Sequence, residues 1–198
     1  MVAKIIGHVF ETVYEIAGVS LLLGVLFMFA WLYLSEHGRK EGFRRWMDSL
    51  KTDPDFRKMF IFALYAAMLL CKTLLARRIW HDPFRNVIGI WGFYDEKGEL
   101  YTENFENILL FVPYLFLLFR ALEKYLWRKS RMTAAGILIR SAVISVLTSV
   151  FIETAQILFR VGAIQLSDLV FNLIGGLAGG LLYLIVFYRR KKKLYGQG

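Results

Sequence analysis

Two neighbouring apolar segments near the end of the chain carry side chains that can do chemistry. Glu153, Gln156 and Arg160 follow one another at intervals of three and four residues, and Asp168 and Asn172 are four residues apart. These intervals place the members of each set on one face of a helix. Charged groups cost on the order of 2.5–3.5 kcal/mol at the centre of a membrane helix, so both sets are candidates for function.

The two sets are expected to meet at one boundary of the membrane. Only residues 161–167 separate the two helices, and helices joined so closely are antiparallel neighbours. Glu106 and Asn107 open another apolar segment, which is predicted to begin on the same side. An aromatic-rich segment, 77–106, precedes it and is expected to lie on the outer leaflet and cover the cluster.

Three interpretations of this polar cluster remain open. As a binding site, Arg160 and Arg85 would hold a phosphate or a carboxylate. As an enzyme, Glu153 would be desolvated and serve as general acid or base, and Asp168, kept ionised by Arg160 and the helix N-terminus, would be its partner or the nucleophile. As packing alone, the groups would form interhelical hydrogen bonds worth about 0.6–2 kcal/mol each. The three histidines are dispersed and form no metal pattern, so neither metal nor cofactor is expected.

Long hydrophobic runs must position these side chains. Apolar residues make up 57% of the 198, with a mean hydropathy of +0.48, which is too hydrophobic for a soluble domain of this size. The first run, 13–34, is long enough to cross a hydrocarbon layer of about 30 Å as a helix, and the second is shorter. Together the runs predict an all-α polytopic integral membrane protein with about five transmembrane helices. The runs cover residues 13–34, 59–76, 107–122, 133–159 and 168–188, with Ser167 as the expected N-cap of the last.

The charge distribution predicts the orientation. The net charge is +9, and Lys and Arg gather after the first run, after the third run and in the tail 189–198. Because positive loops stay in the cytoplasm, the N-terminus is expected outside and the C-terminus inside. The same rule accounts for the basic balance without a nucleic-acid partner.

Four glycines in the last run predict close helix packing. Gly175, Gly176, Gly179 and Gly180 contain two overlapping GxxxG spacings, which let another helix backbone approach. The partner helix could belong to the same chain or to a second copy, so a homo-oligomer stays open.

These motifs are similar to those of the VanZ-like family of membrane proteins. The matching positions are Glu153-x-x-Gln156-x-x-x-Arg160, then Asp168-x-x-x-Asn172-x-x-Gly175 and Gly179, and more weakly Arg85-Asn86, Asn107-Ile108-Leu109 and Pro113. The family's usual Asn-Leu-Ile-Pro-Phe stands here as Asn86-Val87-Ile88-Gly89-Ile90. The resemblance spans about residues 77–188, with the first helix outside it.

The resemblance implies a bacterial origin and accessory resistance to teicoplanin-type glycopeptides. We expect two parts in the chain: residues 1–58, a first helix with a basic cytoplasmic loop, and residues 59–198, a VanZ-like membrane domain with the outer loop 77–106 and the basic cytoplasmic tail 189–198. The expected function is binding of a lipid-linked wall precursor or a lipoglycopeptide at an outward-facing polar pocket of the bacterial cytoplasmic membrane, with membrane lipids as further partners. A membrane-embedded hydrolase or transferase acting through Glu153 and Asp168 is the alternative. A transporter is the second alternative, disfavoured because the charges gather at one membrane face and no inverted repeat is visible.

Overall fold

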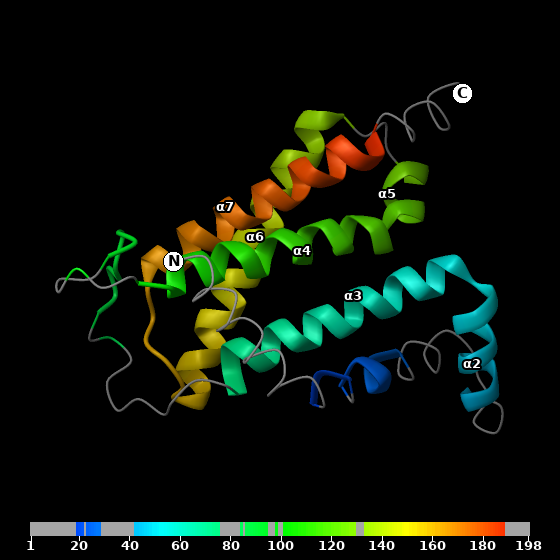
Figure 1. Cartoon of the computed structure of the whole chain (residues 1–198), viewed down its shortest axis with the longest axis horizontal. Coiled ribbons are helices and arrows are strands. Elements are labelled where there is room, and N and C mark those ends of the chain that lie inside the picture. Colours follow the sequence, from blue (N-terminus) through cyan, green and yellow to red (C-terminus); the bar gives the residue numbers. More distant parts are fainter. Residues whose placement is uncertain are drawn as a thin grey trace.

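The computed structural model describes residues 19–21, 23–28, 42–75, 84, 86–94, 98, 101–129 and 133–188, and the fold they form is all-α (Figure 1). The helices, with two π-helical turns marked η, are Val19–Met28, α2 (Gly42–Thr52), α3 (Pro54–Leu70), η1 (Cys71–Leu75), α4 (Glu103–Ala121), α5 (Glu123–Lys129), α6 (Ala134–Phe159), α7 (Leu166–Tyr183) and η2 (Leu184–Tyr188).

Three of the described helices are long and apolar enough to span a membrane. They are α4, α6 and the continuous helix Leu166–Phe187, with mean hydropathies of 1.3, 2.0 and 2.1. Large side chains such as Ile139, Leu147 and Phe151 of α6 are more than half exposed, as expected for a helix that faces lipid. The chain is therefore an integral membrane protein. The five-helix count and the orientation of the termini stay predictions, because the described part of the first run is shorter than a span and α3 falls short of the same criteria.

The helices run up and down beside one another. α7 packs most extensively on α4 and also on α6, and α3 packs on the other side of α4. The ends of α3 and α6 and the starts of α4 and α7 lie together on the left of Figure 1. We call this end of the bundle the outer end, because the sequence predicts that it faces outward.

Glycines allow α7 to lie tightly between its two neighbours. A Cβ atom on Gly179 would stand 2.3 Å from the Val112 carbonyl oxygen of α4, and one on Gly175 would stand 2.5 Å from the Ile108 carbonyl oxygen. Gly176 and Gly180 instead face fully buried serines of α6, Ser145 and Ser141. Both GxxxG spacings are thus used within one chain, one for each neighbouring helix.

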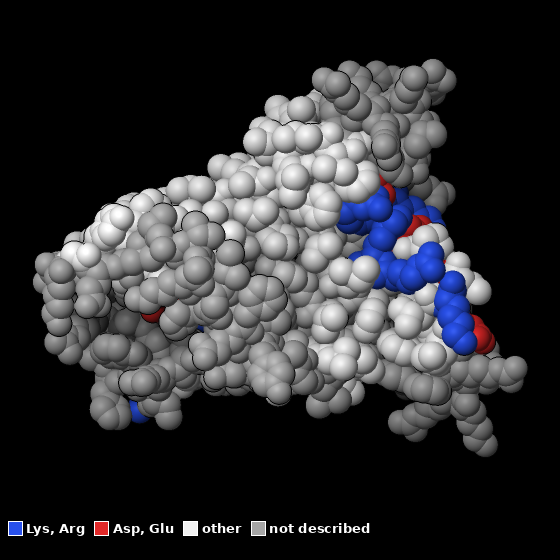
Figure 2. All heavy atoms as spheres, viewed as in Figure 1, with Lys and Arg blue, Asp and Glu red and all other residues white. Residues whose placement is uncertain are grey.

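The opposite end of the bundle carries two short helices, α2 and α5, where the sequence predicted basic loops. α2 places Trp46 against Phe56 and Phe60, with ring centroids 6.5 and 5.6 Å apart. Lys and Arg side chains gather on the surface at this end (Figure 2), where α2 and α5 lie in Figure 1. The positive-inside rule makes this end the predicted cytoplasmic side.

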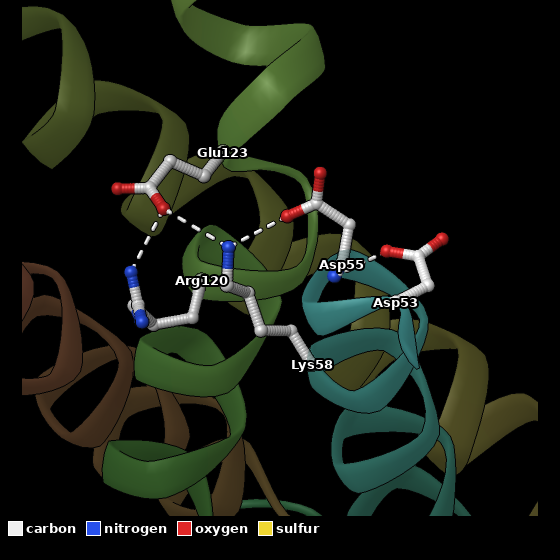
Figure 3. A network of polar contacts seen from close by, with 5 residues as sticks. All are labelled: Asp53, Asp55, Lys58, Arg120 and Glu123. Atoms are coloured by element: carbon white, nitrogen blue, oxygen red, sulfur yellow. Dashed lines mark hydrogen bonds and ion pairs between the residues drawn. The ribbon is translucent and has the colours of Figure 1, made fainter. Parts of the chain in front are cut away.

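An ion-pair network ties α3 to the junction of α4 and α5 at this end (Figure 3). Glu123, whose side chain is only 4% exposed, lies 2.8 Å from Arg120 and 3.7 Å from Lys58. Lys58 is also 2.6 Å from Asp55, one turn back in α3. Arg120 further stacks over the ring of Phe187, 4.0 Å from its centroid. A buried carboxylate paired in this way fixes the relative positions of the helices.

Candidate functional site

Polar side chains of α6 and α7 meet at the outer end, where α6 ends and α7 begins. Asn172 donates a hydrogen bond from Nδ2 to Ser149 Oγ at 2.9 Å, which joins the polar faces of α7 and α6 directly. Ser149 is fully buried and Asn172 is 5% exposed. The expected meeting of the two faces is therefore present in the fold.

Gln156 extends the cluster to a third helix. Its Nε2 donates to the backbone carbonyl of Thr73 at 3.0 Å, and the side chain is 2% exposed. Thr73 lies in η1, the π-helical turn that ends α3. Such turns shift backbone carbonyls out of the regular i−4 pattern and are frequent at functional sites. Sequence periodicity gave no signal for this contact, because the partner is a backbone atom on a distant helix.

The two candidate carboxylates occupy different surroundings. Asp168 is 2% exposed in the first turn of α7, where the helix dipole favours a negative charge. Glu153 is partly exposed on α6. The acid–base hypothesis assigned the desolvated position to Glu153, whereas the structure gives the deeper burial to Asp168.

Arg160 does not join the buried cluster. It is the C-cap of α6, adopts a left-handed backbone with φ 54°, and is exposed. Its guanidinium forms no hydrogen bond or ion pair with any other side chain of the described part. In a continuous helix Arg160 would share a face with Glu153 and Gln156. Because α6 ends at Phe159, one residue earlier, Arg160 leaves that face. Arg85, the other predicted anion-binding residue, lies outside the described residues.

Glu106 and Asn107 are placed at the outer end by the first turns of α4. Glu106 forms an ion pair with Lys72 of η1, with Oε2 and Nζ 2.9 Å apart. Asn107 is 7% exposed. The pairing with Glu106 brings Lys72 into contact with the polar cluster. The sequence offered one signal for this ion pair: both residues fall at the predicted outer ends of their helices.

The segment 86–94 covers the starts of α4 and α7. Asn104, fully buried, donates from Nδ2 to the carbonyl oxygens of Ile90 and Gly92, both at 2.8 Å. The backbone N–H of Leu166 donates to the Val87 carbonyl at 2.8 Å. Phe93 stacks on Phe105 of α4, with centroids 4.2 Å apart, and contacts Phe171 of α7 at 5.9 Å. Residues 86–94 thus close over these helix ends, and part of the predicted cover, 77–106, lies outside the described residues.

Gly89 stands where the family's usual sequence has proline, and it shapes this cover. Its φ is +75°, and its N–H donates to the carbonyl and side-chain oxygens of Asn86 at 3.2 and 3.3 Å. Asn86 itself is exposed, so its role in the described part is to close this turn. A Cβ on Gly89 would collide with Ser167 Oγ. The prediction of Ser167 as N-cap is wrong: Gln165 is the N-cap, and Ser167 is buried in the first turn beneath Gly89.

Several buried polar atoms at the outer end have unused hydrogen-bonding capacity. Within the described residues no partner is found for Nδ2 of Asn107, Oε1 of Gln156 or Oδ1 of Asn172. Buried polar atoms are almost always paired, with protein, water or a ligand. The site can therefore both donate to and accept from a bound polar group. No group of three or more His, Cys, Asp or Glu side chains suited to a metal occurs in the part of the chain that the structure describes.

The helical fold defines a membrane protein with a cluster of buried polar residues at one end of its bundle. The family model described as VanZ/LLP1 matches residues 19–187, and the chain belongs to this family. The match begins at residue 19 and so includes the described part of the first hydrophobic run, which the resemblance had left outside. No curated protein and no solved structure matches the chain.

Proposed function

We propose that this protein binds a lipid-linked cell-wall precursor or a lipoglycopeptide at its polar outer end, in the cytoplasmic membrane of a bacterium. Binding there would give accessory resistance to teicoplanin-type glycopeptides, the phenotype that the family resemblance implies. The observation that carries the proposal is the set of buried amides with unused hydrogen-bonding capacity on Asn107, Gln156 and Asn172.

The chemistry of the site suits an amphiphile with a peptide or sugar headgroup. Amide side chains offer both a donor and an acceptor, which peptide bonds and sugar hydroxyls require of a partner. Asp168 adds a buried carboxylate that accepts hydrogen bonds. The lipid-exposed faces of the surrounding helices give a hydrocarbon chain an apolar surface beside the headgroup.

An enzymatic function of Asp168 is the second candidate, carried by the burial of this carboxylate in a helix N-terminal turn. Transfer or hydrolysis on a lipid-linked substrate would need a second acid or base, and Glu153 is the only other carboxylate that the sequence placed on the facing helix. Binding is favoured over catalysis because Arg160, the predicted partner that would keep Asp168 ionised, is exposed and outside the cluster.

The test is teicoplanin susceptibility of a Gram-positive host that expresses wild type, Gln156→Leu, Asp168→Asn or Glu153→Gln at matched membrane levels. Asp48→Asn, an exposed acid of α2 at the opposite end, is the control. We expect protection by wild type and by the control, and loss of protection by Gln156→Leu and Asp168→Asn.

The outcomes separate the candidate functions. Equal protection by all the variants would mean that the polar cluster only holds helices together. Consumption of a purified lipid-linked precursor by wild type in detergent, abolished by Asp168→Asn while the precursor still binds, would establish catalysis in place of simple binding.

A further inference from the structure

An apolar groove opens on the side of the bundle formed by the helix Val19–Met28, α3 and α4. Its volume is about 400 Å³, within the range of roughly 300–1,000 Å³ that small-molecule sites show. The lining side chains include Ser20, Leu21, Ile61, Leu64, Met68 and Leu117. At Gly24 the first helix meets α3 so closely that a Cβ would stand 3.0 Å from the Leu64 Cα.

Two polar atoms accompany the groove. Tyr65 also lines it, and its hydroxyl donates to the Leu110 carbonyl of α4 at 2.9 Å. Ser20 is 2% exposed, and its hydroxyl finds no partner among the described residues. The groove therefore fits a hydrocarbon chain and offers one hydroxyl donor, which an ester carbonyl or a similar acceptor near the head of a lipid would satisfy.

The groove is directed toward the outer end. Ile61 and Met68 are seven residues apart on α3, a rise of about 10 Å at about 1.5 Å per residue. That length fits within one leaflet, which is about half of a 30 Å hydrocarbon layer. Gly24 lies against Leu64, and Met28 packs with Phe56 and Met59, so the first helix runs antiparallel to α3. This direction puts Ser20 beside Met68, at the outer mouth of the groove.

A lysine side chain, Lys72, lies near the outer mouth of the groove. Lys72 follows Met68 by four residues, one turn closer to the outer end on the same side of the helix. Its side chain is 26% exposed, and the ion pair with Glu106 fixes its position. An ammonium group carries three N–H donors, so one that pairs with a carboxylate can still bind a phosphate oxygen of a lipid headgroup at the end of an apolar groove.

We infer that the groove holds the hydrocarbon chain of a phosphate-bearing membrane lipid, with Ser20 at its glycerol or linker region and Lys72 at its phosphate. This inference deepens the proposed function by assigning the hydrocarbon chain of the ligand to the groove and its headgroup to the outer end. It rests on the proposed function for the biological identity of that ligand. The lipid site itself rests on the groove and on Lys72 alone.

The experiment is native mass spectrometry of the full chain, purified in detergent and exposed to equal amounts of phosphatidylglycerol and of diacylglycerol, which has identical chains and no phosphate. The variants are Met68→Trp, which fills the groove, and Lys72→Gln, which removes the charge. The matched control is Leu147→Trp, which adds the same side chain on an exposed face of α6.

We expect wild type and Leu147→Trp to retain one lipid per chain and to prefer phosphatidylglycerol by about fivefold, the effect of one lysine near a phosphate. Met68→Trp should lower retention of both lipids by about tenfold. Lys72→Gln should retain lipid and lose the preference. Retention by Met68→Trp equal to that of the control would overturn the groove as the chain site, and an unchanged preference in Lys72→Gln would overturn the assignment of the headgroup.

The susceptibility assay distinguishes this inference from the proposed function. If Met68→Trp loses lipid while Asp168→Asn still protects against teicoplanin, the lipid site stands and the proposed function fails. If Asp168→Asn abolishes protection while Met68→Trp retains lipid as wild type does, the proposed function stands and the inference fails.

Discussion

Replacing Gly179 with alanine should force α7 away from α4. The new Cβ would lie 2.3 Å from the Val112 carbonyl oxygen, 3.1 Å from the Leu115 Cβ and 3.2 Å from the Val112 carbonyl carbon. Two of these atoms belong to the backbone of a membrane-spanning helix, so no side-chain rotation relieves the contact. The helices must separate by about 1 Å to restore an ordinary distance, and a gap of that size forfeits up to half of the dispersion energy of the affected contacts.

The expected net cost is about 1–2 kcal/mol. Overpacking in a well-packed interior typically costs about 1–3 kcal/mol, and we take about 2–3 kcal/mol here because the clash is with backbone atoms that cannot rotate away. Alanine returns up to about 1 kcal/mol of helix propensity relative to glycine. At about 2–4 °C per kcal/mol for a chain of this length, the midpoint of thermal unfolding should fall by about 2–8 °C.

The single cysteine supplies the assay. Cys71 is 1% exposed, so a thiol-reactive fluorogenic dye added to the detergent-solubilised protein reports unfolding as this residue becomes accessible. The control is Ala178→Val, which adds two methyl groups to the neighbouring, exposed position of the same helix. The control should melt within about 1 °C of wild type, because surface changes usually stay within about 0.5 kcal/mol.

A Gly179→Ala protein that melts at or above the wild-type temperature would refute the reasoning. It would show that α4 and α7 do not approach each other through this glycine. Equal losses for Gly179→Ala and Ala178→Val would instead show that both faces of α7 are packed, which contradicts the lipid-facing assignment of Ala178.

Three further predictions test other parts of the fold. Asn104→Leu removes two hydrogen bonds to the outer segment, each worth about 0.5–1.5 kcal/mol, so amide exchange of residues 90–92 should accelerate; unchanged exchange would show that Asn104 does not hold this segment. Gln156→Leu leaves the Thr73 carbonyl without its donor and should cost about 1–3 kcal/mol in the same cysteine-accessibility melt, whereas an unchanged melting point would mean that water replaces the amide. In a Cys71→Ala background, a thiol reagent that cannot cross membranes should label Gly98→Cys and spare Lys124→Cys in intact cells, and the reverse pattern would invert the orientation.

The hydrophobic pattern alone determined the fold class and most helix positions. The predicted run 133–159 corresponds to α6, Ala134–Phe159, with Thr133 as its N-cap, and the run 168–188 corresponds to α7 and η2. This success has a physical reason: a helix in lipid must satisfy its own backbone and be apolar over its whole length, so each span is a local property of the sequence. The motifs around Glu153 and Asp168 likewise identified the family and the end of the bundle that carries the polar groups.

The partners within the site were decided by tertiary structure. Whether Gln156 would reach Thr73, and whether Lys72 would pair with Glu106, depends on how α3 packs against α4 and α6. Arg160 lies outside the polar cluster because α6 ends at Phe159, one residue before it. The assignment of Gly175 and Gly179 to α4, and of Gly176 and Gly180 to α6, depends on the rotation of α7 between its neighbours. Spacing fixes which residues share a helical face, but only packing fixes what that face contacts, because packing depends on every neighbouring helix at once.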